Sequence, residues 1–255
     1  PAEEGGYGAK EMIANGALNG VDKIFGWHNW PAISYGKAIC KEGVVMCANA
    51  SFTIEVAGSG GHASQPDICN DPVLAAAAVT MALQQIVSRR LPPQDAAVIS
   101  VTSIDAKSGE TIIPDRAFLR GSVRMASTAG LARIGELMQE IASSTAKAYG
   151  VEAKVNFSQR YPAVVNSKEE TAEFGRCLGQ VFGEDFECRE TAIPLMASED
   201  FSYYLDKVPG AFALVGAGDG ASHSVPCHNA TYDFNDKLIE PMVRAMSLVV
   251  GAPAP

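Results

Sequence analysis

The chain has 255 residues, of which 47% are hydrophobic and 19% are charged, a composition typical of a soluble globular protein with enough length for about two domains. Its formal net charge is -9, and an acidic chain without a basic cluster argues against nucleic acid and anionic membrane surfaces as partners. The most apolar stretch, residues 73–87, is interrupted by three polar side chains and is too short to span a bilayer.

Six cysteines are scattered along the chain without a CxxC pair. This favours reduced thiols in a cytoplasmic protein over a disulfide framework or a zinc ribbon. The chain starts with Pro1 rather than Met and enters directly at an acidic, glycine-rich motif. We therefore expect it to be part of a longer protein.

Two adjacent carboxylates, Glu3 and Glu4, precede a glycine cluster and a predicted helix over residues 9–15. Because neighbouring side chains cannot both point the same way, one carboxylate can bind a cation while the other faces a substrate or water. The alternative is a solvated helix start, where acids interact favourably with the helix dipole.

A short strand is predicted over residues 21–27, and it leads into His28. Pro31 stops any helix there and holds the preceding residue extended. A histidine at a strand end is a candidate ligand, although a packed or surface imidazole is the more common case.

Residues 49–159 predict a separate module. Asp71 followed by Pro72 is a favoured helix start, and Ser127 or Thr128 opens a second helix that Gly150 ends. With the strands between them, the order is β-α-β-β-α-β, which is that of a ferredoxin-like sandwich. Such a unit buries its own core and can be inserted into another domain. The strands are predicted at residues 51–56, 96–104, 117–125 and 151–157.

The remaining residues return to a different pattern. Ser167 and Glu170 form the sequence of a capping box before a helix, and Ser198 is a candidate N-cap for a short helix. Residues 211–215 are apolar throughout and predict a buried strand. Pro241 lies inside the pattern of the last helix, which predicts a start near residue 240 or a kink.

The chain has four histidines, each in a loop or at a strand end. Together with Glu3 and Glu4 they supply the residue types of a catalytic zinc-class site: imidazoles and a carboxylate as ligands, and a free carboxylate as base. No HExxH-type helix is present, so spacing alone leaves metal binding and a structural role open. The histidines are His28, His62, His223 and His228, of which we interpret His223 as a supporting or surface residue.

Several stretches together resemble the metal-dependent amidohydrolases of the aminoacylase and carboxypeptidase superfamily, in particular the hippurate and indole-acetyl-amino-acid hydrolases. They occur in the order of that family and cover nearly the whole chain. The stretches are PAEEGGYGAKEMI, FGWHNWP, GSGGHASQPDICNDPVLAAAAVTMALQQIVSRR, IIPDRAFLRGSVR, MASEDFSYYL and CHNATYDFND.

The resemblance implies an α/β fold: a zinc-peptidase-like catalytic domain, incomplete at its N-terminus, formed by residues 1–48 and 160–255. Residues 49–159 would be an inserted ferredoxin-like α+β domain that acts as a lid and dimerisation domain. It also implies a homodimer, a small-molecule N-acyl amino acid substrate, and two divalent cations per subunit, such as zinc, manganese, cobalt or nickel.

Individual roles follow from the same resemblance. Glu3 matches the general base that activates a metal-bound water, and Glu4, His28 and His228 match metal ligands. His62 matches a histidine that reaches the active site of the partner subunit and stabilises the oxyanion. The substrate-contacting positions are Arg124, Thr111 and, in a supporting role, Glu199.

Two departures from the family pattern affect these expectations. The family has two further ligands, a Cys and a His, upstream of the PAEE motif, so we expect this chain alone to bind the metal pair poorly and to be inactive. Thr111 and Ile112 stand where the family usually has Asn-Val, which places substrate specificity in question.

Three functions are therefore weighed. The first is metal-dependent hydrolysis of the amide bond of N-acyl amino acids, such as hippurate-like conjugates. The second is a metallo-exopeptidase or dipeptidase, and the third is a non-catalytic dimeric relative. Retention of both glutamates and of the three candidate histidine ligands and donors favours an enzyme.

Overall fold

The computed structural model describes residues 3–253 and divides the chain into two compact units. The first comprises the described residues up to Met46, Val164–Leu195, and those from Glu199 onwards. The second comprises Cys47–Ala163 and Met196–Ser198. The roles of these units as catalytic and lid domains stay predictions, with boundaries expected near residues 48 and 160.

The first unit is built on a three-stranded sheet in the order β1-β11-β2. Strand β1 (Ile24–Ser34) runs parallel to β11 (Gly210–Gly218), and β2 (Ala38–Ile39) pairs antiparallel on the other side of β11. Strand β3 (Gly43–Met46) forms an antiparallel pair with β10 (Val164–Asn166). Only the neighbourhoods of β1 and β11 were predicted from the sequence, because β2, β3 and β10 are too short to show a period.

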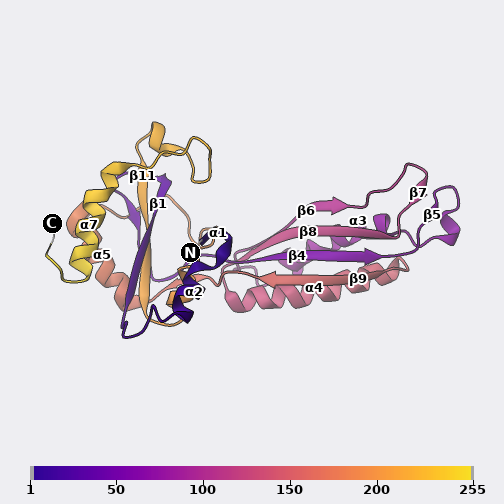
Figure 1. Cartoon of the computed structure of the whole chain (residues 1–255), viewed down its shortest axis with the longest axis horizontal. Helices are drawn as coiled ribbons and strands as arrows, with labels where there is room; N and C mark the ends of the chain where they lie inside the picture. The colour runs from indigo at the N-terminus through magenta and orange to yellow at the C-terminus, as the bar shows by residue number, and fades with distance from the viewer. Residues whose placement is uncertain (1–2, 254–255) are drawn as a thin grey trace. The chain divides into compact units, whose positions relative to one another are not determined.

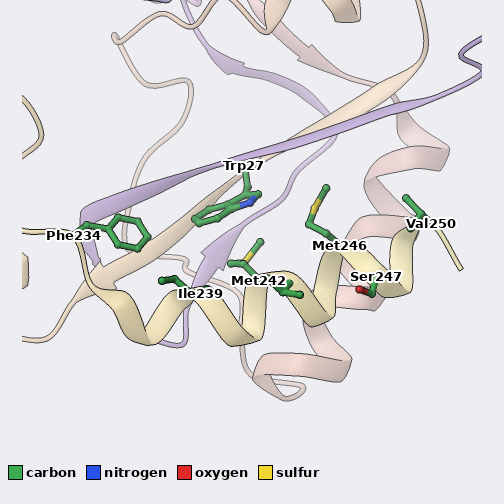
Figure 2. Close-up of a pocket in the computed structure, with 8 residues that line it drawn as sticks. Trp27, Phe234, Ile239, Met242, Met246, Ser247 and Val250 are labelled. Atoms are coloured by element: carbon green, nitrogen blue, oxygen red, sulfur yellow. The ribbon is translucent and has the colours of Figure 1, made fainter. Parts of the chain in front are cut away.

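Every residue of β11 is buried, as its apolar run predicted. Helices α5 (Lys168–Phe182) and α7 (Ile239–Val249) pack against each other beside the sheet (Figure 1) and share an apolar core with β11. Helix α7 begins as the sequence indicated, with Pro241 in its first turn. An apolar groove of about 440 Å³ runs between this helix and β1 (Figure 2). It is lined by Trp27, Phe234, Ile239, Met242, Val243, Met246, Ser247 and Val250.

Short helices complete the first unit. At its N-terminal end lie α1 (Glu3–Gly6) and α2 (Gly8–Ala14), and α2 contacts α6 (Ser202–Leu205). Two 3-10 turns, η3 (Ser222–Ser224) and η4 (Asp236–Leu238), lie on the segment between β11 and α7.

The second unit is a four-stranded antiparallel sheet in the order β6-β8-β4-β9. Its two long helices contact each other and therefore cover the same face (Figure 1). The predicted ferredoxin-like order is confirmed. The elements are β4 (Ala48–Ala57), α3 (Pro72–Leu83), β6 (Ala97–Asp105), β8 (Arg116–Met125), α4 (Thr128–Ala148) and β9 (Glu152–Gln159).

The second unit also contains several shorter elements. Strands β5 (Gly61–His62) and β7 (Ile112–Ile113) pair antiparallel, and η1 (Pro66–Ile68) is a single 3-10 turn. The helix predicted to run to residue 90 ends at Leu83 and is followed by a π-helical turn, Ile86–Arg90. Among residues 3–253, no helix is both long enough and apolar enough to cross a bilayer.

The predicted helix caps have mixed outcomes. Asp71 Oδ1 accepts hydrogen bonds from the backbone of Val73 (2.8 Å) and Leu74, as expected. The capping box at Ser167 is wrong: its hydroxyl accepts from Gly210 N (3.2 Å) and makes no cap. Ser198 caps nothing either, because the helix begins only at residue 202. At Ser167, a tertiary hydrogen bond with Gly210 has replaced the local cap.

Asn166 is a buried polar residue that joins β10 to the central strand. Its side-chain nitrogen donates to the carbonyls of Phe212 (2.9 Å) and Lys41 (3.0 Å), and its oxygen accepts from Phe212 N (2.8 Å). Only 2% of its surface is exposed. A buried amide so fully paired fixes the position of β10 against β11.

We predict that Asn166→Ala lowers the free energy of unfolding of the first unit by about 2–3 kcal/mol, because buried backbone groups of Phe212 lose their partners. Urea denaturation followed by tryptophan fluorescence measures this, since Trp27 and Trp30 both lie in that unit. Asn19→Ala, at an exposed asparagine of the same unit, is the control. Equal midpoints for the two variants would contradict the prediction.

Candidate functional site

The adjacent glutamates lie on a tight turn that the glycines make possible. Gly5 has φ 153° and Tyr7 has φ 52°, both in the region that L residues rarely adopt. The following helix α2 has no cap from its own flanking side chain. Instead Asp200, from far along the chain, accepts a hydrogen bond from Ala9 N at 2.7 Å. The turn that carries Glu3 and Glu4 is thereby attached to the segment around residue 200.

Glu4 and His228 meet although they lie near opposite ends of the chain. Nδ1 of His228 is 3.1 Å from Oε1 of Glu4, and their side chains are 69% and 68% exposed. His228 adopts φ 68°, a left-handed conformation that costs a non-glycine residue about 1–2 kcal/mol. The structure therefore holds an imidazole and a carboxylate, both typical metal donors, in one exposed contact.

His28 lies within β1 and not at a strand end, so the predicted end of the strand at residue 27 is wrong. Pro31 is accommodated in the strand because β1 is at the edge of the described sheet, where a missing N–H costs no ladder hydrogen bond. Nδ1 of His28 lies 2.6 Å from the carbonyl of Asn29. This contact places the proton on Nδ1 and leaves the Nε2 lone pair available to bind a cation.

Four carboxylates gather at the turn that carries Glu3 and Glu4. Burial raises the pKa of Glu3, and the negative charges of Asp200 and Glu4 raise it further, while His28 lowers it. Burial also raises the pKa of Glu199 to about 7, with the charge of Glu3 as the next cause. Glu199 is therefore disposed to hold or exchange a proton near neutral pH, and Glu3 binds a proton more strongly than an exposed glutamate does.

The segment that bears Glu199 also links the other parts of the site. The ring of Phe201 packs against Gly26 of β1, where a Cβ atom would come within 2.7 Å of it. Tyr204 donates from its hydroxyl to the sulfur of Met12 in α2 at 3.3 Å. The segment 199–204 thus contacts both the strand that carries His28 and the helix behind the glutamates.

Asp200 and Phe201 are the positioning residues that sequence reasoning missed. The resemblance had singled out Glu199, but a single carboxylate in a polar stretch gives no sign of a partner 191 residues away. Only the burial of Asp200, which is 8% exposed, distinguishes it from an ordinary surface acid.

The donor set is the right kind for a divalent cation but is incomplete. Glu4 and His228 are in contact, and His28 influences Glu3 electrostatically. However, the described residues 3–253 contain no group of three or more His, Cys, Asp or Glu side chains placed to hold a metal ion. Catalytic zinc sites use three protein ligands, and the three ligand assignments stay predictions.

The remaining predicted site residues lie in the second unit. His62 is exposed on β5, and its Nδ1 accepts from Ser64 N at 3.1 Å. Thr111 is exposed in the turn before β7. Arg124 on β8 is half-buried; burial lowers its pKa, and the neighbouring charge of Arg160 lowers it further. A desolvated guanidinium beside a second cation suits an anionic group, while the substrate roles of all three stay predictions.

Comparison with known proteins places this geometry in a family. Residues 1–251 match the peptidase family M20/M25/M40. The chain is 37% identical over 241 residues to hippurate hydrolase of Campylobacter jejuni, covering 94% of this chain and 62% of that protein. It is 33% identical over 243 residues to an IAA-amino acid hydrolase of Arabidopsis thaliana, covering 94% and 54%.

A solved structure supports the same conclusion. The chain superimposes with a TM-score of 0.80 and 26% identity on a Bacillus subtilis protein described as a dinuclear metal binding peptidase of the M20 family, covering 98% of this chain and 62% of that one. The chain belongs to the M20/M25/M40 peptidase family. It spans between about half and two thirds of the length of these relatives.

The raised pKa of Glu199 gives a testable pH dependence. The folded protein keeps this proton up to about pH 7, whereas the unfolded chain loses it near the ordinary glutamate pKa of 4.5. This group therefore makes stability fall as pH rises between those values. We predict that Glu199→Gln raises the free energy of unfolding by about 1–2 kcal/mol at pH 8 and changes it little at pH 4.

Urea denaturation at both pH values measures the effect, with Glu11→Gln, at an exposed glutamate of the same unit, as the control. A stabilisation of equal size at pH 4 and pH 8 would show that titration of Glu199 is not its origin.

Proposed function

We propose that this chain is part of a metal-dependent amidohydrolase that cleaves the amide bond of N-acyl amino acids, such as hippurate-like conjugates. The observation that carries the proposal is the contact of Glu4 with His228 at 3.1 Å beside Glu3, whose pKa is raised. The hippurate and IAA-amino acid hydrolases among its relatives support this substrate class. The cysteines, free among the described residues, support a cytoplasmic location.

The residues of the first unit suit the proton transfers of hydrolysis. Glu3, with a carboxylate of raised pKa, would accept a proton from the attacking water and return it to the leaving amine. Glu4, His28 and His228 would act as ligands to two divalent cations, such as zinc, manganese, cobalt or nickel, completed by further donors. When bound, such a cation polarises the scissile carbonyl as a Lewis acid.

Residues of the second unit would bind the substrate. Nδ1 of His62 accepts from the Ser64 backbone N–H, so the neutral ring carries its proton on Nε2 and can donate to an oxyanion. Arg124 would bind the substrate carboxylate, since its guanidinium is partly desolvated. Thr111 would contact the substrate with a hydroxyl where related enzymes usually have an amide, and it would therefore affect specificity.

We predict that Glu3→Gln in the full-length protein lowers kcat for hippurate hydrolysis by about 10²–10⁴-fold, because the amide cannot accept the proton. Metal content, measured by mass spectrometry, should be unchanged. Glu11→Gln, at an exposed glutamate nearby, should retain normal kcat. Full turnover by Glu3→Gln would refute the assigned role of Glu3.

We further propose that the second unit forms a homodimer, with α3 and the edge strand β6 as the contact surface. Helix α3 is apolar on nearly all sides, and its exposed positions include Leu74 (57%) and Met81 (74%). A helix apolar all round is normally buried. Strand β6 lies at the edge of the described sheet and can pair with a second copy across a twofold axis.

The double variant Leu74→Glu/Met81→Glu should then be monomeric, because four buried carboxylates at a twofold interface are strongly unfavourable. Light scattering after size-exclusion chromatography gives the mass. Tyr149→Glu, at an exposed residue following α4, should leave the dimer intact. A dimer that persists in the double variant would exclude α3 as the interface.

A further inference from the structure

His223 occupies a position that the proposed reaction does not explain. It lies in η3, on the segment 219–235 that joins β11 to η4 and carries His228. This segment has no strand or α-helix of its own. His228 nevertheless adopts the rare φ of 68° and faces Glu4. Something other than regular secondary structure must therefore fix its backbone.

The imidazole of His223 bridges the two ends of this segment. Its Nε2 lies 3.8 Å from Oδ2 of Asp219, the first residue after β11. Its Nδ1 lies 3.8 Å from Oδ2 and 3.3 Å from the carbonyl oxygen of Asp233. The side chain is 20% exposed, far less than that of His228. One ring thus links residues that are fourteen positions apart in the sequence.

Other contacts hold the same loop at separate points. Asp219 Oδ1 accepts from Ala221 N at 3.0 Å, which fixes one partner of His223. At the far side, Asn29 Nδ2 donates to the hydroxyl of Tyr232 at 2.6 Å, attaching the loop to β1 beside His28. The contacts of His223 hold Asp219 and Asp233, the two ends of the loop, close together. We therefore expect the residues around His228 to become more mobile when the His223 side chain is removed.

We propose that His223 is a positioning residue: by joining Asp219 to Asp233 it holds the loop closed and keeps His228 oriented toward Glu4. The proposal rests on the assigned role of His228. The His223 ring has a nitrogen on each side, and each nitrogen faces a carboxylate. An aliphatic side chain cannot make these contacts. A guanidinium, with donors on several sides, can.

The test reads the orientation of His228 directly. In long-range ¹H–¹⁵N spectra of the purified chain, the Nδ1 resonance of His228 should show its contact with Glu4. In His223→Ala this resonance should move to the position of a free imidazole, and amides of residues 219–233 should exchange about fivefold faster. His223→Arg should restore both, and Ser222→Ala, on the same turn, should change neither.

Two further measurements keep the outcome unambiguous. Circular dichroism establishes that each variant is folded; if His223→Ala is not, Asp219→Asn weakens the same bridge and should shift the His228 resonance in the same direction. An unchanged His228 resonance in the folded variants overturns the proposal. Because no hydrolysis is measured, this result is independent of whether Glu3→Gln abolishes turnover.

Discussion

The parallel pairing of β1 with β11 is the contact on which the site depends. It aligns Trp27 with Ala213 and His28 with Leu214. Since parallel strands end at the same edge of a sheet, the segments that follow them are brought together. The loop after β11 carries His228, and β1 carries His28 itself. Two regions that are separated by most of the sequence therefore lie close together, although no local sequence pattern predicts this.

A concentration of acidic groups opposes the stability of this arrangement. Glu3, Glu199 and Asp200 influence one another electrostatically, and partly buried like charges destabilise the folded state. Two features reduce the cost. Asp200 is paired with the N–H of Ala9, and the raised pKa of Glu199 lets it remain protonated near neutral pH. The remaining burial and charge repulsion raise the pKa of Glu3 and make it a stronger base than an exposed glutamate. The same interactions therefore lower the stability of the folded state and increase the basicity of Glu3.

The sequence predicted most elements but little of the site geometry. Period-2 and period-3.6 patterns, with caps such as Asp71, identified the ferredoxin-like unit because its core is built from its own strands and helices. They failed where a long-range partner decides, as at Ser167, which bonds Gly210, and in β1, which continues through Pro31. No periodic pattern in the sequence indicates that Glu4 pairs with His228. Only the resemblance to a family suggested that these two residues act together. The contact of Asp200 with Ala9 was not predicted even from the resemblance.

The Glu4–His228 contact also limits how a cation can bind. Each donor lies on a segment with an unusual backbone conformation and is highly exposed, so neither is held by a surrounding core. A cation bound by both would link the N-terminal turn to the loop after β11, and its binding energy would add to the stability of both. Catalytic zinc sites use three protein ligands, and Nε2 of His28, whose Nδ1 contacts the Asn29 carbonyl, is a nitrogen of the type that fills such a position.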